Sequence, residues 1–121
     1  MRYFMYTLGD ENDPRLTAPP SAELMGEMGE FMAEATASGA LIATGGFAHS
    51  GAAFKVDYAD GAFSVTDGPF SEAKELVGGW ALVEAPSNEA AIDYAKRFLK
   101  IVGGGESRIR PVFGGDDGAP R

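Results

Sequence analysis

The chain has 121 residues, with 18 acidic and 10 basic side chains and a formal net charge of -8. It contains no cysteine and one histidine, which excludes disulfides and a thiolate nucleophile and disfavours a metal site built within one chain. The charge opposes binding to nucleic acid or anionic membranes, and no apolar run suits a signal peptide or a membrane span, so we expect one cytoplasmic domain without metal or other cofactor.

The first half of the chain predicts a strand, a helix and a second strand. Residues 2–8 form a short aromatic run that ends at Gly9, and both of its faces are apolar. From 21 to 38, apolar side chains recur every three or four residues opposite a row of glutamates, which is typical of an amphipathic helix. Residues 40–44 then predict a strand, followed by a loose glycine-rich loop.

The second half predicts a hairpin, two more strands and a second helix. Two alternating runs, 52–58 and 62–66, flank an Asp-Gly pair that suits a tight hairpin turn. A strand is expected over 79–85, and Ser87 begins a helix whose apolar stripe extends to Val102. The final predictions are a strand over 107–113 and a flexible tail over 114–121.

This order of elements is the ferredoxin-like split βαβ pattern of the α+β class. Right-handed crossovers place both helices on one face of an antiparallel sheet. Because the strands at 2–8 and 79–85 are apolar on both faces, the other sheet face would be a bare apolar patch in a monomer. We therefore expect a homodimer in which two sheets face each other as an α+β barrel.

Several distinctive stretches are distributed over residues 1–113: MRYFMYTLGDE, ASGALIATGGF, the segment TDGPFSEAKELVGGW and the closing SRIRPVF. Together they resemble the YCII-related family in its DGPF-type branch. The resemblance implies one ferredoxin-like domain that dimerises as a barrel, with suspected small-molecule chemistry and no assigned reaction. In another branch, a histidine of the first helix is thought to pair with an aspartate as an acid-base dyad. Here methionines lie near that position, so the dyad is not carried over.

The segment from 66 to 80 holds the main candidates for a site. Asp67 and Phe70 belong to an Asp-Gly-Pro-Phe turn, in which Asp67 is either a turn former or a tuned acid or base. Residues 71–75 predict one capped helical turn, with Glu72, Lys74 and Glu75 as candidate catalytic groups. The alternative interpretation of this turn is a solvated charged loop.

Further candidates lie elsewhere in the chain. Trp80 either anchors the core or stacks on a ligand, together with Phe70. Arg108 and Arg110 lie on one side of the last strand and could grip a carboxylate or form ion pairs with Glu72, Glu75 or Glu84. His49, in the loop after the second strand, is either a solvated side chain or an acid-base group.

These observations predict a dimeric protein that binds a small organic molecule and performs metal-free proton transfer of the lyase, isomerase or hydrolase type. An alternative is a non-catalytic dimer that senses a ligand or contacts a transcription partner, because the resemblance extends to proteins found alongside alternative sigma factors. A third is a structural module whose charged turn serves only to keep the protein soluble.

Overall fold

The computed structural model describes residues 1–14, 19–68 and 75–113, with 75–78 described by their backbone alone. Three predicted site residues, Phe70, Glu72 and Lys74, and the predicted tail at 114–121 lie outside the described residues.

Four strands form the main sheet: β1 (Arg2–Gly9), β2 (Leu41–Gly46), β5 (Glu75–Glu84) and β6 (Glu106–Val112). Their order is β2-β5-β1-β6, and every neighbouring pair is antiparallel. With the two helices that connect them, this order is the split βαβ arrangement. The α+β fold predicted from the sequence is confirmed.

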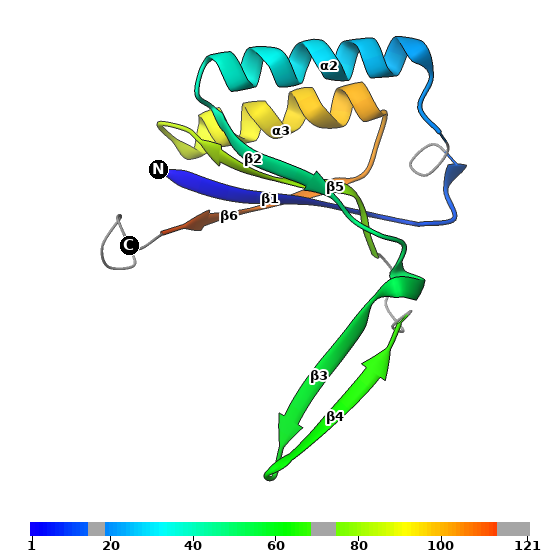
Figure 1. Cartoon of the computed structure of the whole chain (residues 1–121). Coiled ribbons are helices and arrows are strands. Elements are labelled where there is room, and N and C mark those ends of the chain that lie inside the picture. Colours follow the sequence, from blue (N-terminus) through cyan, green and yellow to red (C-terminus); the bar gives the residue numbers. More distant parts are fainter. Residues whose placement is uncertain (15–18, 69–74, 114–121) are drawn as a thin grey trace.

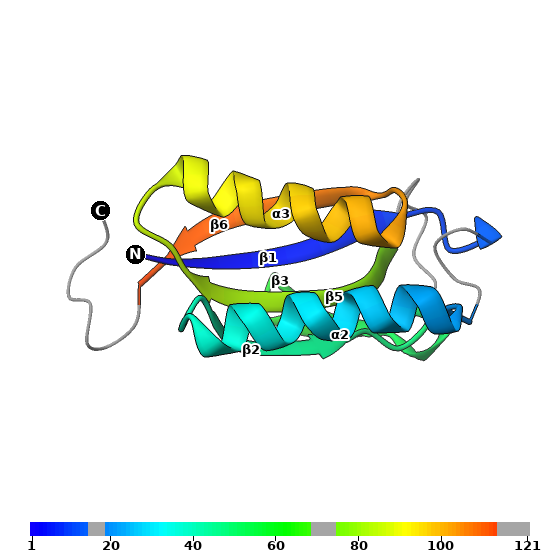
Figure 2. The ribbon, with the colours of Figure 1, turned by 90° about the horizontal axis from the view of Figure 1, so that it is seen from above.

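Helices α2 (Ala22–Ala37) and α3 (Asn88–Val102) lie side by side on one face of this sheet (Figure 2). Each begins at a serine whose hydroxyl accepts a backbone N–H: Ser21 Oγ from Leu24 at 3.1 Å, and Ser87 Oγ from Ala90 at 3.2 Å. α3 ends at Gly103, whose φ of 90° is the left-handed conformation that favours glycine. The expected caps and the placement of both helices on one face are confirmed.

The core lies between this sheet and the helices. Tyr3, Met5 and Thr7 of β1 are buried, whereas the alternate residues of the strand are only half-buried. Val83 of β5 and Ala91 of α3 are 1 % exposed and pack with Tyr3 and Met5 in one cluster. The tyrosine is also held at its polar end, because its hydroxyl donates to Asn88 Oδ1 at 2.8 Å.

The hairpin expected around Asp60 forms a separate two-stranded sheet from β3 (Phe54–Ala59) and β4 (Ala62–Asp67). Asp60 and Gly61 both have positive φ, 52° and 77°, as a tight hairpin turn requires. The hairpin extends away from the helices and from the main sheet (Figure 1). A short 3-10 turn, η1 (Ser50–Ala52), precedes it in what was expected to be a loose loop.

The start of β5 corrects the sequence prediction. The strand begins at Glu75 and not at residue 79, because Glu75 and Leu76 continue the ladder opposite Gly9 and Leu8 of β1. Glu75 was expected in a helical turn on the basis of the preceding serine and the spacing of charges. Pairing with a neighbouring strand outweighs such local preferences.

Candidate functional site

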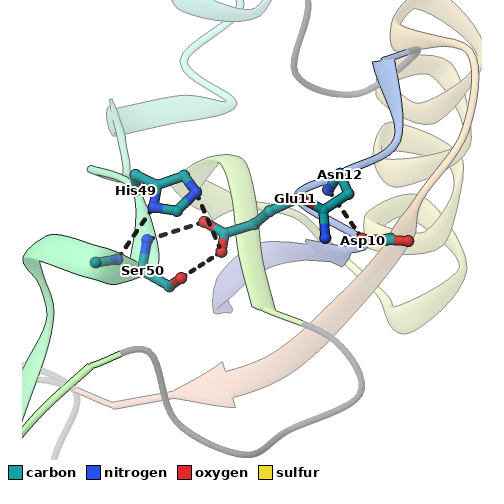
Figure 3. Close-up of polar contacts among 6 residues, drawn as sticks. Asp10, Glu11, Asn12, His49 and Ser50 are labelled. Carbon is teal, nitrogen blue, oxygen red and sulfur yellow. Dashed lines mark hydrogen bonds and ion pairs between the residues drawn. The ribbon is translucent and has the colours of Figure 1, made fainter.

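The topology of the sheet brings two loops together at one end. β1 and β2 are both antiparallel to β5, which lies between them, so they run in the same direction and leave the sheet at the same end. The loop after β1 supplies Glu11, and the loop after β2 supplies His49 and Ser50. Glu11 and Ser50 are 39 positions apart in the chain and in direct contact, and His49 lies beside them (Figure 3).

Glu11 is the centre of this cluster. Its carboxylate accepts the backbone N–H of Ser50 at 2.9 Å and also the Ser50 hydroxyl. The Glu11 side chain is 12 % exposed and Ser50 is buried. The two hydrogen bonds from Ser50 lower the pKa of the Glu11 carboxyl, with nearby His49 adding to the effect, and together they outweigh the opposing effect of burial. Glu11 is therefore ionised at neutral pH.

His49 lies beside this carboxylate with its ring in solvent. Nε2 is 3.7 Å from Glu11 Oε1, and the side chain is 71 % exposed. Nδ1 accepts the backbone N–H of Gly51 at 3.1 Å and so caps η1. Because Nδ1 is an acceptor, a neutral ring carries its proton on Nε2, the nitrogen that faces Glu11. An imidazole held beside an ionised carboxylate is an arrangement that can donate or accept a proton.

The first two residues of the Asp-Gly-Pro-Phe segment lie against the same loop. The N–H of Gly68 donates to the carbonyl of Ala53 at 2.7 Å. A Cβ at Gly68 would lie 2.3 Å from the carbonyl oxygen of Ser50, so only glycine permits this approach. Asp67, the last residue of β4, is thereby held next to the turn that carries His49 and Ser50.

A cavity of about 290 Å³ lies between the helices and the sheet. Its lining comprises Met5, Thr7, Met28, Met32, Thr44, Gly45, Gly79, Trp80, Ala81, Tyr94, Ala95, Phe98, Val102 and Ser107. The walls are mostly apolar, with methionine and aromatic side chains from α2 and α3 facing β1. A volume of this size suits a small organic molecule.

Two hydroxyl-bearing side chains in this lining are notable. Thr7 is 5 % exposed, and no residue within the described parts of the chain forms a hydrogen bond with its hydroxyl. A buried hydroxyl without a partner is costly, and a ligand with one polar group would relieve that cost. Burial raises the pKa of Tyr94, so its phenol keeps its proton.

Comparison with protein families decides the identity of the domain. The sequence profile of the YCII-related domain matches residues 1–113. The chain belongs to the YCII-related family. A search of curated proteins finds no match.

In this YCII-related domain, the structure places the described site residues in three separate places. His49 and Asp67 lie at the end of the sheet where β1 and β2 finish, and the backbone of Glu75 pairs with Gly9 at the same end. Trp80 is among the residues that line the cavity, but its ring stacks on Phe4 with centroids 5.9 Å apart, on the sheet face turned away from the helices.

The two arginines lie elsewhere. Arg108 and Arg110 stand opposite Tyr6 and Phe4 on the sheet face turned away from the helices. Arg108 Nε donates to Glu106 Oε2 at 2.7 Å, and this contact raises the pKa of Arg108. Of the three glutamates expected as partners, Glu84 instead pairs with the N-terminal amino group at 3.4 Å, and Glu72 and the side chain of Glu75 lie outside the described residues. The arginines therefore do not converge with His49 or Asp67.

Sequence reasoning missed Glu11, Ser50 and Thr7. Glu11 lies in the stretch that follows the first predicted strand, and Thr7 lies in the aromatic run of that strand. The strand order could have predicted that Glu11 and His49 lie close together. In a split βαβ fold, the strands that precede these two residues lie on either side of the same antiparallel neighbour and end at the same edge. Among the described residues, no group of three or more acidic, histidine or cysteine side chains could hold a metal ion. No helix in the same set is long and apolar enough to cross a membrane.

Proposed function

We propose that this protein binds a small, largely apolar molecule with one hydrogen-bonding group in the cavity between its helices and sheet. The observation that carries the proposal is the buried hydroxyl of Thr7, which has no hydrogen-bond partner among the described residues and lies in a lining that is otherwise mostly apolar. Apolar walls provide affinity, and a single polar group orients the ligand. Phenols, lactones and small aromatic acids have this chemistry.

The Glu11–His49 pair supports a catalytic form of the proposal. Glu11 follows Thr7 by four residues, and His49 follows Gly45 by four. Because Thr7 and Gly45 line the cavity, a chain of four residues places Glu11 and His49 each within about 14 Å of that lining. Proton transfer by His49, with Glu11 holding a compensating charge, is chemistry of the lyase or isomerase type that needs no metal. If the bound molecule is released unchanged, the protein is a ligand sensor.

We assign the chain to the DGPF-type branch of its family on the basis of Asp67 to Phe70, and we propose that it is a homodimer. The sheet face opposite the helices supports the second proposal. It bears Phe4, Tyr6 and Leu82, and the described helices cover only the other face (Figure 2). A second copy would remove this apolar face from water.

Ligand binding is tested by a thermal-shift screen of phenols, lactones and aromatic acids, followed by calorimetric titration of each hit. Thr7→Val removes the hydroxyl while keeping the shape and should weaken a hit by about 5-fold to 20-fold, as expected for one buried hydrogen bond. Thr36→Val is the matched control, because Thr36 is exposed on α2 and lies outside the lining.

Met32→Trp fills the cavity and should abolish binding. If no compound in these classes binds, or if hits bind equally well to the wild type and to both cavity variants, the proposal is wrong. Turnover of a confirmed ligand by the wild type, lost in His49→Gln, separates an enzyme from a sensor.

A further inference from the structure

The β3–β4 hairpin carries an apolar face that its own chain leaves in water. Val56 stands opposite Val65, and Tyr58 stands opposite Phe63 with ring centroids 4.7 Å apart. These four side chains and Phe54 are 59 % to 74 % exposed. The alternate positions, Lys55, Asp57, Ser64 and Thr66, are polar, so the hairpin is amphipathic.

An isolated hairpin of this kind is not expected to be stable without further contacts. Its strands pair with each other and with no other strand in the described parts of the chain. A single two-stranded hairpin is marginal in water, and a row of exposed aromatic and β-branched side chains is a typical interaction surface. The apolar face, which is interrupted only by Asp67 opposite Phe54 at its base, is therefore built to be covered.

The same chain carries a second surface that complements the first. The sheet face opposite the helices is aromatic at Phe4 and Tyr6 and bears two arginines on the neighbouring strand, Arg108, which is paired with Glu106 on the same face, and Arg110. On the docking side the hairpin is acidic: Asp67 stands opposite Phe54 on the apolar face, and Asp60 lies in the turn, whereas Asp57 on the polar face pairs with Lys55. In a chain of net charge -8, this local contrast favours contact between the hairpin and the arginine-bearing face of another copy.

We propose that the hairpin is an arm that lays its apolar face on the β1–β6 side of the outer sheet face of a second copy. In a two-fold dimer the contact occurs twice, because each copy gives an arm and receives one. Three aromatic and two valine side chains provide on the order of 500 Å² of apolar surface per arm. Two arms and the surfaces they cover would then bury on the order of 2,000 Å², enough for a stable dimer.

In this dimer the hairpin holds the second copy in addition to any contact between the two sheets. Its role does not depend on what occupies the cavity. Failure of the ligand screen would leave it intact, and failure of the arm would leave the ligand proposal intact.

The test compares two substitutions that place the same charge on opposite faces of β4. Phe63→Glu puts a carboxylate on the apolar face of the hairpin. Ser64→Glu puts one at the adjacent position, on the polar face. In sedimentation velocity at about 20 µM, the wild type and Ser64→Glu should both be dimers. Phe63→Glu should be monomeric or at least about 10-fold weaker in association.

Cross-linking identifies the partner surface, and it works even if Phe63→Glu does not fold. The chain has no cysteine, so Val65→Cys and Arg110→Cys can be made in separate copies of different mass, mixed, and treated with a short bismaleimide. The expected product is the mixed dimer. A monomeric wild type, an unweakened Phe63→Glu dimer, or cross-links only between two Val65→Cys copies would overturn the proposal.

Discussion

Gly68 connects the hairpin to the loop that carries His49, and Gly68→Ala tests whether this contact positions the candidate site. The added Cβ would lie 2.3 Å from the carbonyl oxygen of Ser50 and 3.1 Å from that of Ala53. Both neighbours are backbone atoms, which cannot turn aside as a side chain does. To reach an ordinary contact of 3.4 Å, Gly68 and the Ser50 turn must separate by about 1 Å.

The cost of that movement follows from two contributions. Overpacking by one methyl group in a close-packed site costs about 1–3 kcal/mol. The 2.7 Å hydrogen bond from Gly68 N–H to Ala53 would also be weakened, which costs about 0.5–1.5 kcal/mol. We expect the free energy of unfolding to fall by about 2–4 kcal/mol. For a domain of this size, that lowers Tm by on the order of 10 °C.

Urea unfolding measures the change in stability, and proton NMR of the His49 ring reports the local displacement. The single histidine gives one set of imidazole signals, so no assignment is needed. These signals should shift in Gly68→Ala because the turn that holds the ring has moved. If the variant unfolds within about 0.5 kcal/mol of the wild type with unchanged imidazole signals, Gly68 does not position this loop.

Three further substitutions test other parts of the argument. Gly29→Ala, on the exposed side of α2 with no atom within 4 Å of the new Cβ, should raise the free energy of unfolding by about 1 kcal/mol in the same urea assay. Gly103→Ala should lower it by about 1–2 kcal/mol, because φ is 90° there and alanine is strained in that conformation. Glu11→Gln should reduce the loss of folding stability at acid pH. The lowered pKa of Glu11 contributes stability that is fully present above the unfolded-state pKa of about 4.3. This contribution is lost as the pH falls through the folded-state pKa, and the variant lacks it at every pH. Melting temperatures of wild type and Glu11→Gln should therefore differ more at pH 7 than at pH 3, and a constant difference would contradict the assignment.

Local patterns in the sequence were sufficient for most of the secondary structure. The three-and-four spacing of apolar residues predicts α2 and α3, and both serine caps and Gly103 lie where the pattern places them. The Asp60–Gly61 pair predicts the hairpin turn, because few residues adopt positive φ without strain. Such signals work because they depend on neighbours within one turn of the chain.

The candidate site could not be predicted in the same way. Methionines at 28 and 32 were correctly expected on the apolar stripe of a helix, but the spacing of side chains does not reveal that the packed layers leave a cavity beside them. Alternation correctly predicted that Arg108 and Arg110 share one side of the last strand, whereas the sheet face that they occupy and their separation from His49 required the strand order.

The sequence alone thus determined which segments are helices and strands and which side chains share a face, because hydrophobic period and backbone preference act over short distances. Only the tertiary structure decided that Glu11 meets Ser50, that Gly68 rests on the Ser50 carbonyl, and that Thr7 borders a cavity. These contacts join residues brought together by strand pairing and layer packing, and no local pattern encodes which distant segments become neighbours.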